Sequence, residues 1–221
     1  MFPFGLVGAY LTILLDSWNM EHSLKHRLFA GMPLLDIRDD AAKYTREMKE
    51  LQVQKPYNCT VFCLQATLNL IGESDYTSQL SGTEMKADTK LQQYTENNDN
   101  LSIAVMRLFE FYLAFMFDDF GRTFEIRKEH AEGQIEKSVP GQFGLCVMYY
   151  CNAMAAISLY RAKGGAKYKR TACKLAKKVQ SWASSGVSTL FDHSCSEGNR
   201  FSHFALRCCS CFRTPTSFTT V

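Results

Sequence analysis

Residues 99–117, with the sequence DNLSIAVMRLFEFYLAFMF, give the clearest indication of the fold. Apolar side chains recur there at steps of three and four residues, which places them on one face of an α-helix. These residues are Leu101, Val105, Leu108, Tyr112 and Phe115. Asn100 precedes the run and is a candidate N-terminal cap. The spacing therefore predicts an amphipathic helix over this stretch.

Helical spacing continues on both sides of this run, whereas the alternating pattern of a half-buried strand is scarce. Residues 118–121 and 164–165 form short breaks, and Pro140 with Gly141 marks another. The segment 143–160 is apolar on nearly every face, which is typical of a helix packed between neighbours. We predict helices over residues 4–16, 19–30, 35–52, 58–72, 83–96, 99–117, 121–137, 141–161 and 167–185.

Two helices joined by a tight turn and followed by two more indicate a helical-repeat architecture. We therefore predict an all-α fold, in which antiparallel helix pairs stack as a tetratricopeptide-like helical repeat or solenoid. The match to a tetratricopeptide turn is imperfect, because Thr123 stands where a small residue is usual. The helical-repeat domain is expected to span residues 1–186. Residues 187–221 are rich in Ser, Thr, Phe and Cys and contain no Lys, so we expect an irregular, disordered tail.

Composition and charge exclude several classes of protein. The net charge of +3 over 221 residues is too small to indicate a nucleic-acid-binding protein. No run reaches the roughly 20 apolar residues that span a bilayer, so no transmembrane segment is expected. Residues 2–15 are apolar but lack the basic residues and cleavage site of a secretory signal, so we expect a buried helix. Nine cysteines in a long helical chain favour reduced thiols and a cytoplasmic location.

No motif for nucleotide binding or for a common hydrolase is present. The patterns G-x-x-x-x-G-K-[ST], G-x-G-x-x-G, H-E-x-x-H and G-x-S-x-G are all absent. Cys59 and Cys63 share one face of a predicted helix, either as a redox or metal-binding pair or as two small buried residues. We favour buried residues. A thiol-dependent enzyme that uses Cys59 or Cys63 remains the alternative hypothesis, and it requires a His brought close by the fold.

Two further groups of polar residues are weaker candidates. Asp118 and Asp119 form either an acid–base pair or a helix cap, and their place between two helices favours the cap. The C-terminal tail holds residue types that bind zinc: His193, Cys195, His203, Cys208, Cys209 and Cys211. Their spacing is irregular, whereas zinc sites usually need two close pairs of ligands. We therefore assign no catalytic, cofactor-binding or metal-binding residue.

Residues 161–178 are the strongest electrostatic feature, because they contain eight Lys or Arg residues and no acid. At about 100° per residue, five of the basic residues fall within one arc of roughly 100°. They are Lys167, Arg170, Lys174, Lys177 and Lys178. This arc is either a solvated outer face or a docking surface for an acidic protein or an anionic lipid. Nucleic acid is disfavoured, because no aromatic residues interleave the basic ones.

The segment Cys63–Met85, CLQATLNLIGESDYTSQLSGTEM, resembles part of the helical connecting region of large multidomain signalling ATPases. In these proteins a kinase-like head and an AAA-type ATPase domain precede the helical region, and a histidine kinase or nucleotide cyclase often follows. The segments 19–24, 44–51 and 174–184 resemble other parts of that region, in the same order. The matching residues of the first segment are Gln65, Leu68, Asn69, Leu70, Gly72, Leu80 and Gly82.

The resemblance covers residues 19–185 and implies a scaffold, since the family's catalytic domains have no counterpart in this chain. We expect a non-catalytic protein-interaction module in signal transduction, either a fragment or a divergent relative of the helical region. Its partner would be a protein or an adjoining signalling domain, contacted through the basic arc. The resemblance carries no catalytic residue and no cofactor to this chain.

Overall fold

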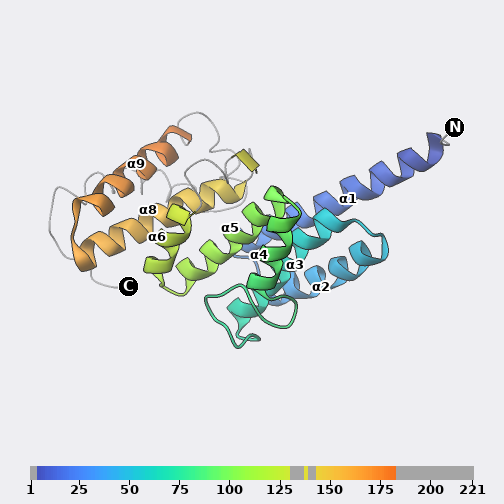
Figure 1. Cartoon of the computed structure of the whole chain (residues 1–221), viewed down its shortest axis with the longest axis horizontal. Coiled ribbons are helices and arrows are strands. Elements are labelled where there is room, and N and C mark those ends of the chain that lie inside the picture. The colour runs from blue at the N-terminus through green and yellow to red at the C-terminus, as the bar shows by residue number, and fades with distance from the viewer. Residues whose placement is uncertain (1–3, 130–136, 139–142, 183–221) are drawn as a thin grey trace.

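The computed structural model describes residues 4–129, 137–138 and 143–182, and within these residues it is helical and has no strand (Figure 1). This confirms the all-α prediction for the described part of the chain. The helices are α1 (Phe4–Phe29), α2 (Leu34–Glu50), α3 (Gln54–Ile71), α4 (Ala87–Glu96), α5 (Asn100–Met116), α6 (Phe120–Glu129), α8 (Phe143–Lys163) and α9 (Ala166–Trp182).

The turn between α5 and α6 follows from two acidic residues. Asp118 takes a φ of 58°, which ends α5. The backbone N–H of the next residue, Asp119, donates a hydrogen bond of 2.8 Å to the carbonyl of Ala114. The carboxylate of Asp119 accepts the backbone N–H of Arg122 at 2.9 Å, so it caps α6 as predicted. The cap of α5 is Asp99 rather than Asn100, because the Asp99 carboxylate accepts both the N–H and the hydroxyl of Ser102.

Helix α1 corrects two sequence-based expectations. It is one helix where the pattern predicted two, 4–16 and 19–30, since no Gly or Pro interrupts residues 9–29 and the Ser17 hydroxyl bonds the carbonyl of Ile13 within the helix. The expected burial of its first half is also wrong. Tyr10, Leu11 and Leu15 are 54%, 51% and 63% exposed. Figure 1 shows why: this half of α1 extends past the other helices.

The main core lies around α3 and α5, which bury side chains on most of their faces. Phe29 at the end of α1 reaches both Phe109 and Tyr112 of α5, with ring centroids 5.9 and 5.0 Å apart. Helix α8 approaches α5 closely at Gly144, where a Cβ atom would lie 2.7 Å from the side chain of Leu108. Large aromatic rings and one close helix crossing thus join α1, α5 and α8 into one core.

Three pairs of consecutive helices form hairpins: α2 with α3, α5 with α6, and α8 with α9. The α8–α9 turn contains Gly164 and Gly165, with φ of 68° and 98°, which a residue with a Cβ rarely adopts. Helix α8 contacts α1, α5, α6 and α9, which confirms the prediction of a helix packed between neighbours. The boundary at residue 186 and the segment 187–221 lie outside the described residues.

Candidate interaction surface

Helix α9 has one packed side, and that side fixes which of its residues face solvent. Ala172 and Ala176 pack with Ala156 and Ile157 of α8, and Phe124 of α6 lies against the same cluster. Leu175 and Val179 pack with residues of α8 one turn further along. The alanines let the two helix backbones approach closely, so this contact leaves α9 little freedom to rotate.

The opposite side of α9 presents a dense group of exposed cations. We define the basic surface by the exposed basic residues on this side: Lys167, Arg170, Lys174 and Lys177. All four belong to the arc predicted from the sequence. Lys167 stands 4.7 Å from the ring centroid of Tyr168, and the Arg170 Nε donates to the carbonyl of Ala166 in its own helix at 3.4 Å.

Lys178, the fifth residue of the predicted arc, has a different environment. Its side chain is half-buried, its Nζ donates to the hydroxyl of Tyr149 at 2.9 Å, and it lies 4.6 Å from the centroid of that ring. A cation at this distance from an aromatic face is attracted to it. Lys178 therefore helps to attach α9 to α8, and we do not count it in the basic surface.

Local charge on the basic surface is uncompensated over several residues. No acid occurs in residues 161–178. Within the part of the chain that the structure describes, Lys167, Arg170 and Lys177 have no ion pair with a carboxylate. A rigid helix face with repeated positive charge attracts an acidic surface over distances of about 10 Å at ordinary ionic strength.

The two thiols named as candidate nucleophiles lie in the core rather than in a reactive site. Cys59 and Cys63 are both fully buried on α3. Burial, and next the negative charge of Glu21, raise the pKa of Cys59 well above its ordinary value and raise the pKa of Cys63 to about 12. A thiol whose pKa is raised in this way stays protonated at neutral pH, and the thiolate is the reactive form.

A buried ion pair on α1 is a polar feature that the sequence patterns did not indicate. Glu21 is fully buried and Lys25 is 4% exposed, and the Lys25 Nζ lies 2.8 Å from the Glu21 carboxylate. The His22 Nδ1 lies 2.9 Å from the other carboxylate oxygen and 2.8 Å from the carbonyl of Trp18. The i, i+4 spacing of Glu21 and Lys25 was a usable signal, but it is normally read as a surface pair.

The residues that carry the resemblance to signalling ATPases fold the loop between α3 and α4. The Asn69 amide donates to the carbonyls of Tyr76, Thr77 and Gln79, and the Gln65 amide bonds Asn69 and the carbonyl of Ser81. A Cβ atom on Gly82 would lie 2.4 Å from the Gln65 Nε2. Leu80 is fully buried. The structural role of Gln65, Asn69 and Gly82 is therefore to hold residues 72–86 against α3.

Within the described residues, no group of three or more His, Cys, Asp or Glu side chains is arranged to hold a metal ion. The zinc-type residues of the tail lie outside them. A depression at the α2–α3 turn is lined by Met48, Lys49, Gln52, Val53, Gln54 and Tyr57. None of these lining residues is a His, Cys, Asp or Glu. None of the helices in the described ranges combines the length and the apolarity needed to cross a membrane. The basic surface is thus the strongest candidate site in this part of the chain.

Comparison with protein-family models, with curated proteins and with solved structures finds no match for this chain. Its function is therefore argued from its own residues.

Proposed function

We propose that this chain is a non-catalytic helical interaction module that binds an acidic protein surface through the basic surface of α9. The observation that carries the proposal is the division of α9 into two sides. One side is locked against α8 by Ala172, Leu175, Ala176 and Val179, and the other presents the cations. A helix held in this way displays its charges in a fixed pattern, which favours recognition of one partner over others.

The finer parts of the proposal concern architecture and origin. Three helical hairpins support a tetratricopeptide-like stack, in which neighbouring pairs bury each other's apolar sides. The loop held by Gln65, Asn69 and Gly82 gives a physical reason for the residues shared with the helical region of signalling ATPases. We propose that the chain is a fragment or a divergent relative of such a region. Five unpaired thiols on described helices support a reducing, cytoplasmic environment.

The alternative, a thiol-dependent enzyme, is weakened by burial of its two candidate nucleophiles. Because burial raises the pKa of Cys59 and Cys63, we expect both to resist labelling by a thiol reagent in the native protein and to react fast after denaturation. Peptide mapping by mass spectrometry distinguishes them from the other cysteines. Native labelling of either residue as fast as free cysteine would revive the enzyme hypothesis.

An affinity pull-down tests the proposed function directly. The bait is the whole chain, compared with the variant Lys167→Glu/Arg170→Glu/Lys177→Glu. The control variant Lys43→Glu/Arg46→Glu/Lys49→Glu makes the same change of net charge on exposed residues of α2. We expect acidic proteins to be retained by the wild type and by the control and lost from the α9 variant. If all three proteins retained the same acidic proteins equally, the basic surface of α9 would not be the binding site.

A further inference from the structure

The chain itself contains exposed acidic residues of opposite charge to the basic surface. Residues 73–99 hold six Asp or Glu residues and only two Lys residues, Lys86 and Lys90. We define the acidic surface by four exposed carboxylates of the 72–86 loop and α4: Asp75, Glu84, Asp88 and Glu96. Glu73, the other exposed acid of the loop, is left out because it pairs with Arg38. Within the described residues, Asp75, Glu84 and Asp88 have no ion pair with a cation.

The acidic surface is held in place by the core. Asn69 and Gln65 fix the loop through its carbonyl groups, and the buried side chains of Leu80 and Met85 anchor it. Tyr76 stands next to Asp75 and is 50% exposed. An exposed tyrosine beside carboxylates suits a lysine or arginine side chain, because the ring attracts the cation and covers its apolar stem.

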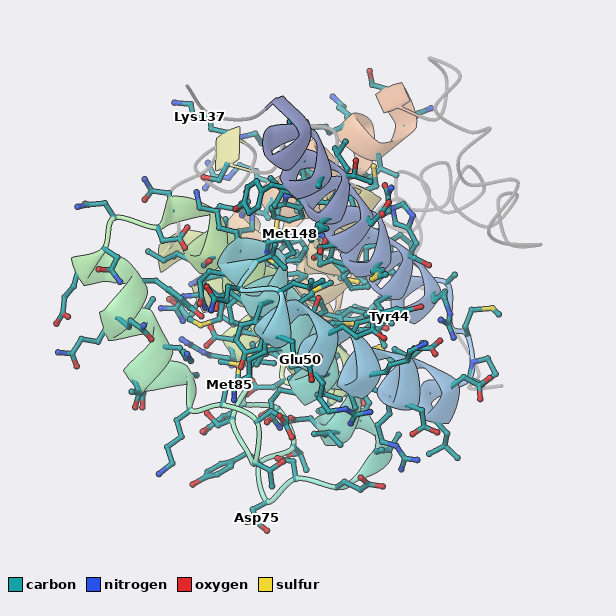
Figure 2. All side chains as sticks on the ribbon, turned by 90° about the vertical axis from the view of Figure 1, so that its right-hand side faces the viewer. Tyr44, Glu50, Asp75, Met85, Lys137 and Met148 are labelled. Atoms are coloured by element: carbon teal, nitrogen blue, oxygen red, sulfur yellow. The ribbon has the colours of Figure 1, made fainter. Side chains whose placement is uncertain are left out.

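The two surfaces cannot meet within one molecule. Figure 1 shows α9 at the upper left and the 72–86 loop at the bottom, with α5, α6 and α8 between them. In Figure 2, turned by 90°, Asp75 again lies at the lower edge of the molecule. Because packing against α8 fixes α9, the basic surface can reach these carboxylates only on another molecule.

We infer that the basic surface of one copy docks on the acidic surface of a second copy, head to tail. This inference rests on the proposed function and names a second copy of the chain as the acidic partner. After one such contact, one copy still carries an unused acidic surface and the other an unused basic surface, so the contact does not close on itself as a two-fold dimer does. Such a contact builds rings or open chains of copies.

Charge complementarity of this kind affects the rate and specificity of association more than its strength. Exposed ion pairs are individually weak and are screened by salt. The association is therefore expected to be weak, concentration-dependent and strongly reduced by salt. Association through the exposed apolar half of α1 would behave differently, because salt does not weaken apolar contacts.

Sedimentation velocity of the whole chain over a concentration series tests the inference. We expect the mean sedimentation coefficient to rise with concentration at about 50 mM NaCl and the self-association to weaken roughly tenfold or more at about 300 mM. The variant Lys167→Glu/Arg170→Glu/Lys177→Glu and the variant Asp75→Lys/Glu84→Lys/Glu96→Lys should each remain monomeric. The α2 variant Lys43→Glu/Arg46→Glu/Lys49→Glu is the control and should associate like the wild type. Circular dichroism confirms that each variant is folded.

Two complementation experiments make the result specific. A mixture of the two monomeric variants should associate again with the two variants alternating, because the two intact surfaces match each other and so do the two charge-reversed ones. The variant with all six substitutions keeps the wild-type net charge and should associate again. A monomeric wild type at low salt, association that survives salt, or failure of both complementations would overturn the inference. The proposed function would outlast that failure if acidic proteins were still lost selectively from the α9 variant in the pull-down.

Discussion

The Nζ atom of Lys178 donates a hydrogen bond of 2.9 Å to the hydroxyl of Tyr149, and the same cation lies 4.6 Å from the centre of the tyrosine ring. This contact joins α9 to α8 beside the apolar cluster of Leu175 and Val179. Lys177, the next residue back along the helix, is exposed. Two adjacent lysines of the same helix thus have different roles: Lys178 helps to pack α9 against α8, and Lys177 contributes to the surface charge.

Removing the packed lysine should therefore destabilise the protein more than removing its exposed neighbour. We expect Lys178→Ala to lower the free energy of unfolding by about 1 kcal/mol, through the lost hydrogen bond and cation–ring attraction. The matched control Lys177→Ala should change it by less than about 0.5 kcal/mol. Urea denaturation followed by circular dichroism measures both. Equal effects of the two substitutions would place Lys178 on the surface.

The conformation of the loop between α3 and α4 should depend more on the Asn69 side chain than on any contact made by the side chains of the loop itself. Asn69→Ala leaves several loop carbonyls without their donor, and we expect a loss of about 2–3 kcal/mol in the free energy of unfolding. Gly82→Ala forces a methyl group against the Gln65 amide, at an expected cost of about 1–2 kcal/mol. Pairing Gly82→Ala with Gln65→Ala in a double-mutant cycle checks this clash. Additive effects would show that the two residues do not touch.

The buried pair of Glu21 and Lys25 should be sensitive to the loss of one partner and tolerant of the loss of both. Glu21→Ala leaves a buried ammonium group without its counter-ion, and we expect a loss of about 3–5 kcal/mol in the free energy of unfolding. Replacing both residues, as Glu21→Leu with Lys25→Met, should recover most of that loss. Thermal and urea denaturation of the three proteins measure this. If the Glu21→Ala protein were as stable as the wild type, Glu21 would not be buried as described.

The stability contributed by His22 should depend on pH. The hydrogen bond with Glu21 is the largest of the effects that raise the pKa of His22, and it outweighs the opposing effects of burial and Lys25. A raised pKa in the folded state means that His22 stabilises the fold below pH 6.5 and loses this contribution as the pH rises through the raised value. His22→Ala should therefore destabilise the protein more at about pH 5.5 than at about pH 8.

His26 provides the comparison for this pH dependence. Burial lowers the pKa of His26, and repulsion by His22 and Lys25 lowers it further. The folded state therefore favours neutral His26, and protonation destabilises it as the pH falls below 6.5. His26→Ala should give the opposite pH trend to His22→Ala. Parallel trends in the two variants would contradict the assigned environments.

The sequence predicted those features that depend on spacing along one helix. The two sides of α9 and the capping part of Asp119 could be deduced in this way, because each depends on residues three or four positions apart. Contacts between distant residues could not be deduced. Lys178 looked like part of the basic arc because nothing in the sequence places Tyr149 beneath it. The exposed start of α1 depends on how far the other helices extend, which no local pattern records.

The acidic surface was missed for a similar reason. Its carboxylates are scattered along a loop and a short helix, so they form no periodic pattern in the sequence. Only the hydrogen bonds of Asn69 and Gln65 show that the loop is held against α3. Charge clusters that depend on a folded loop require the structure to be recognised.

Carboxyl-to-amine cross-linking of the protein bound to its partner, read by mass spectrometry, tests most directly whether the basic surface is where contact is made. The account predicts cross-links from carboxylates of the partner to Lys167, Lys174 and Lys177 on α9. The exposed lysines of α2, Lys43 and Lys49, are internal controls and should remain unlinked. Cross-links that concentrate on α2 and leave α9 unmodified would contradict the central claim.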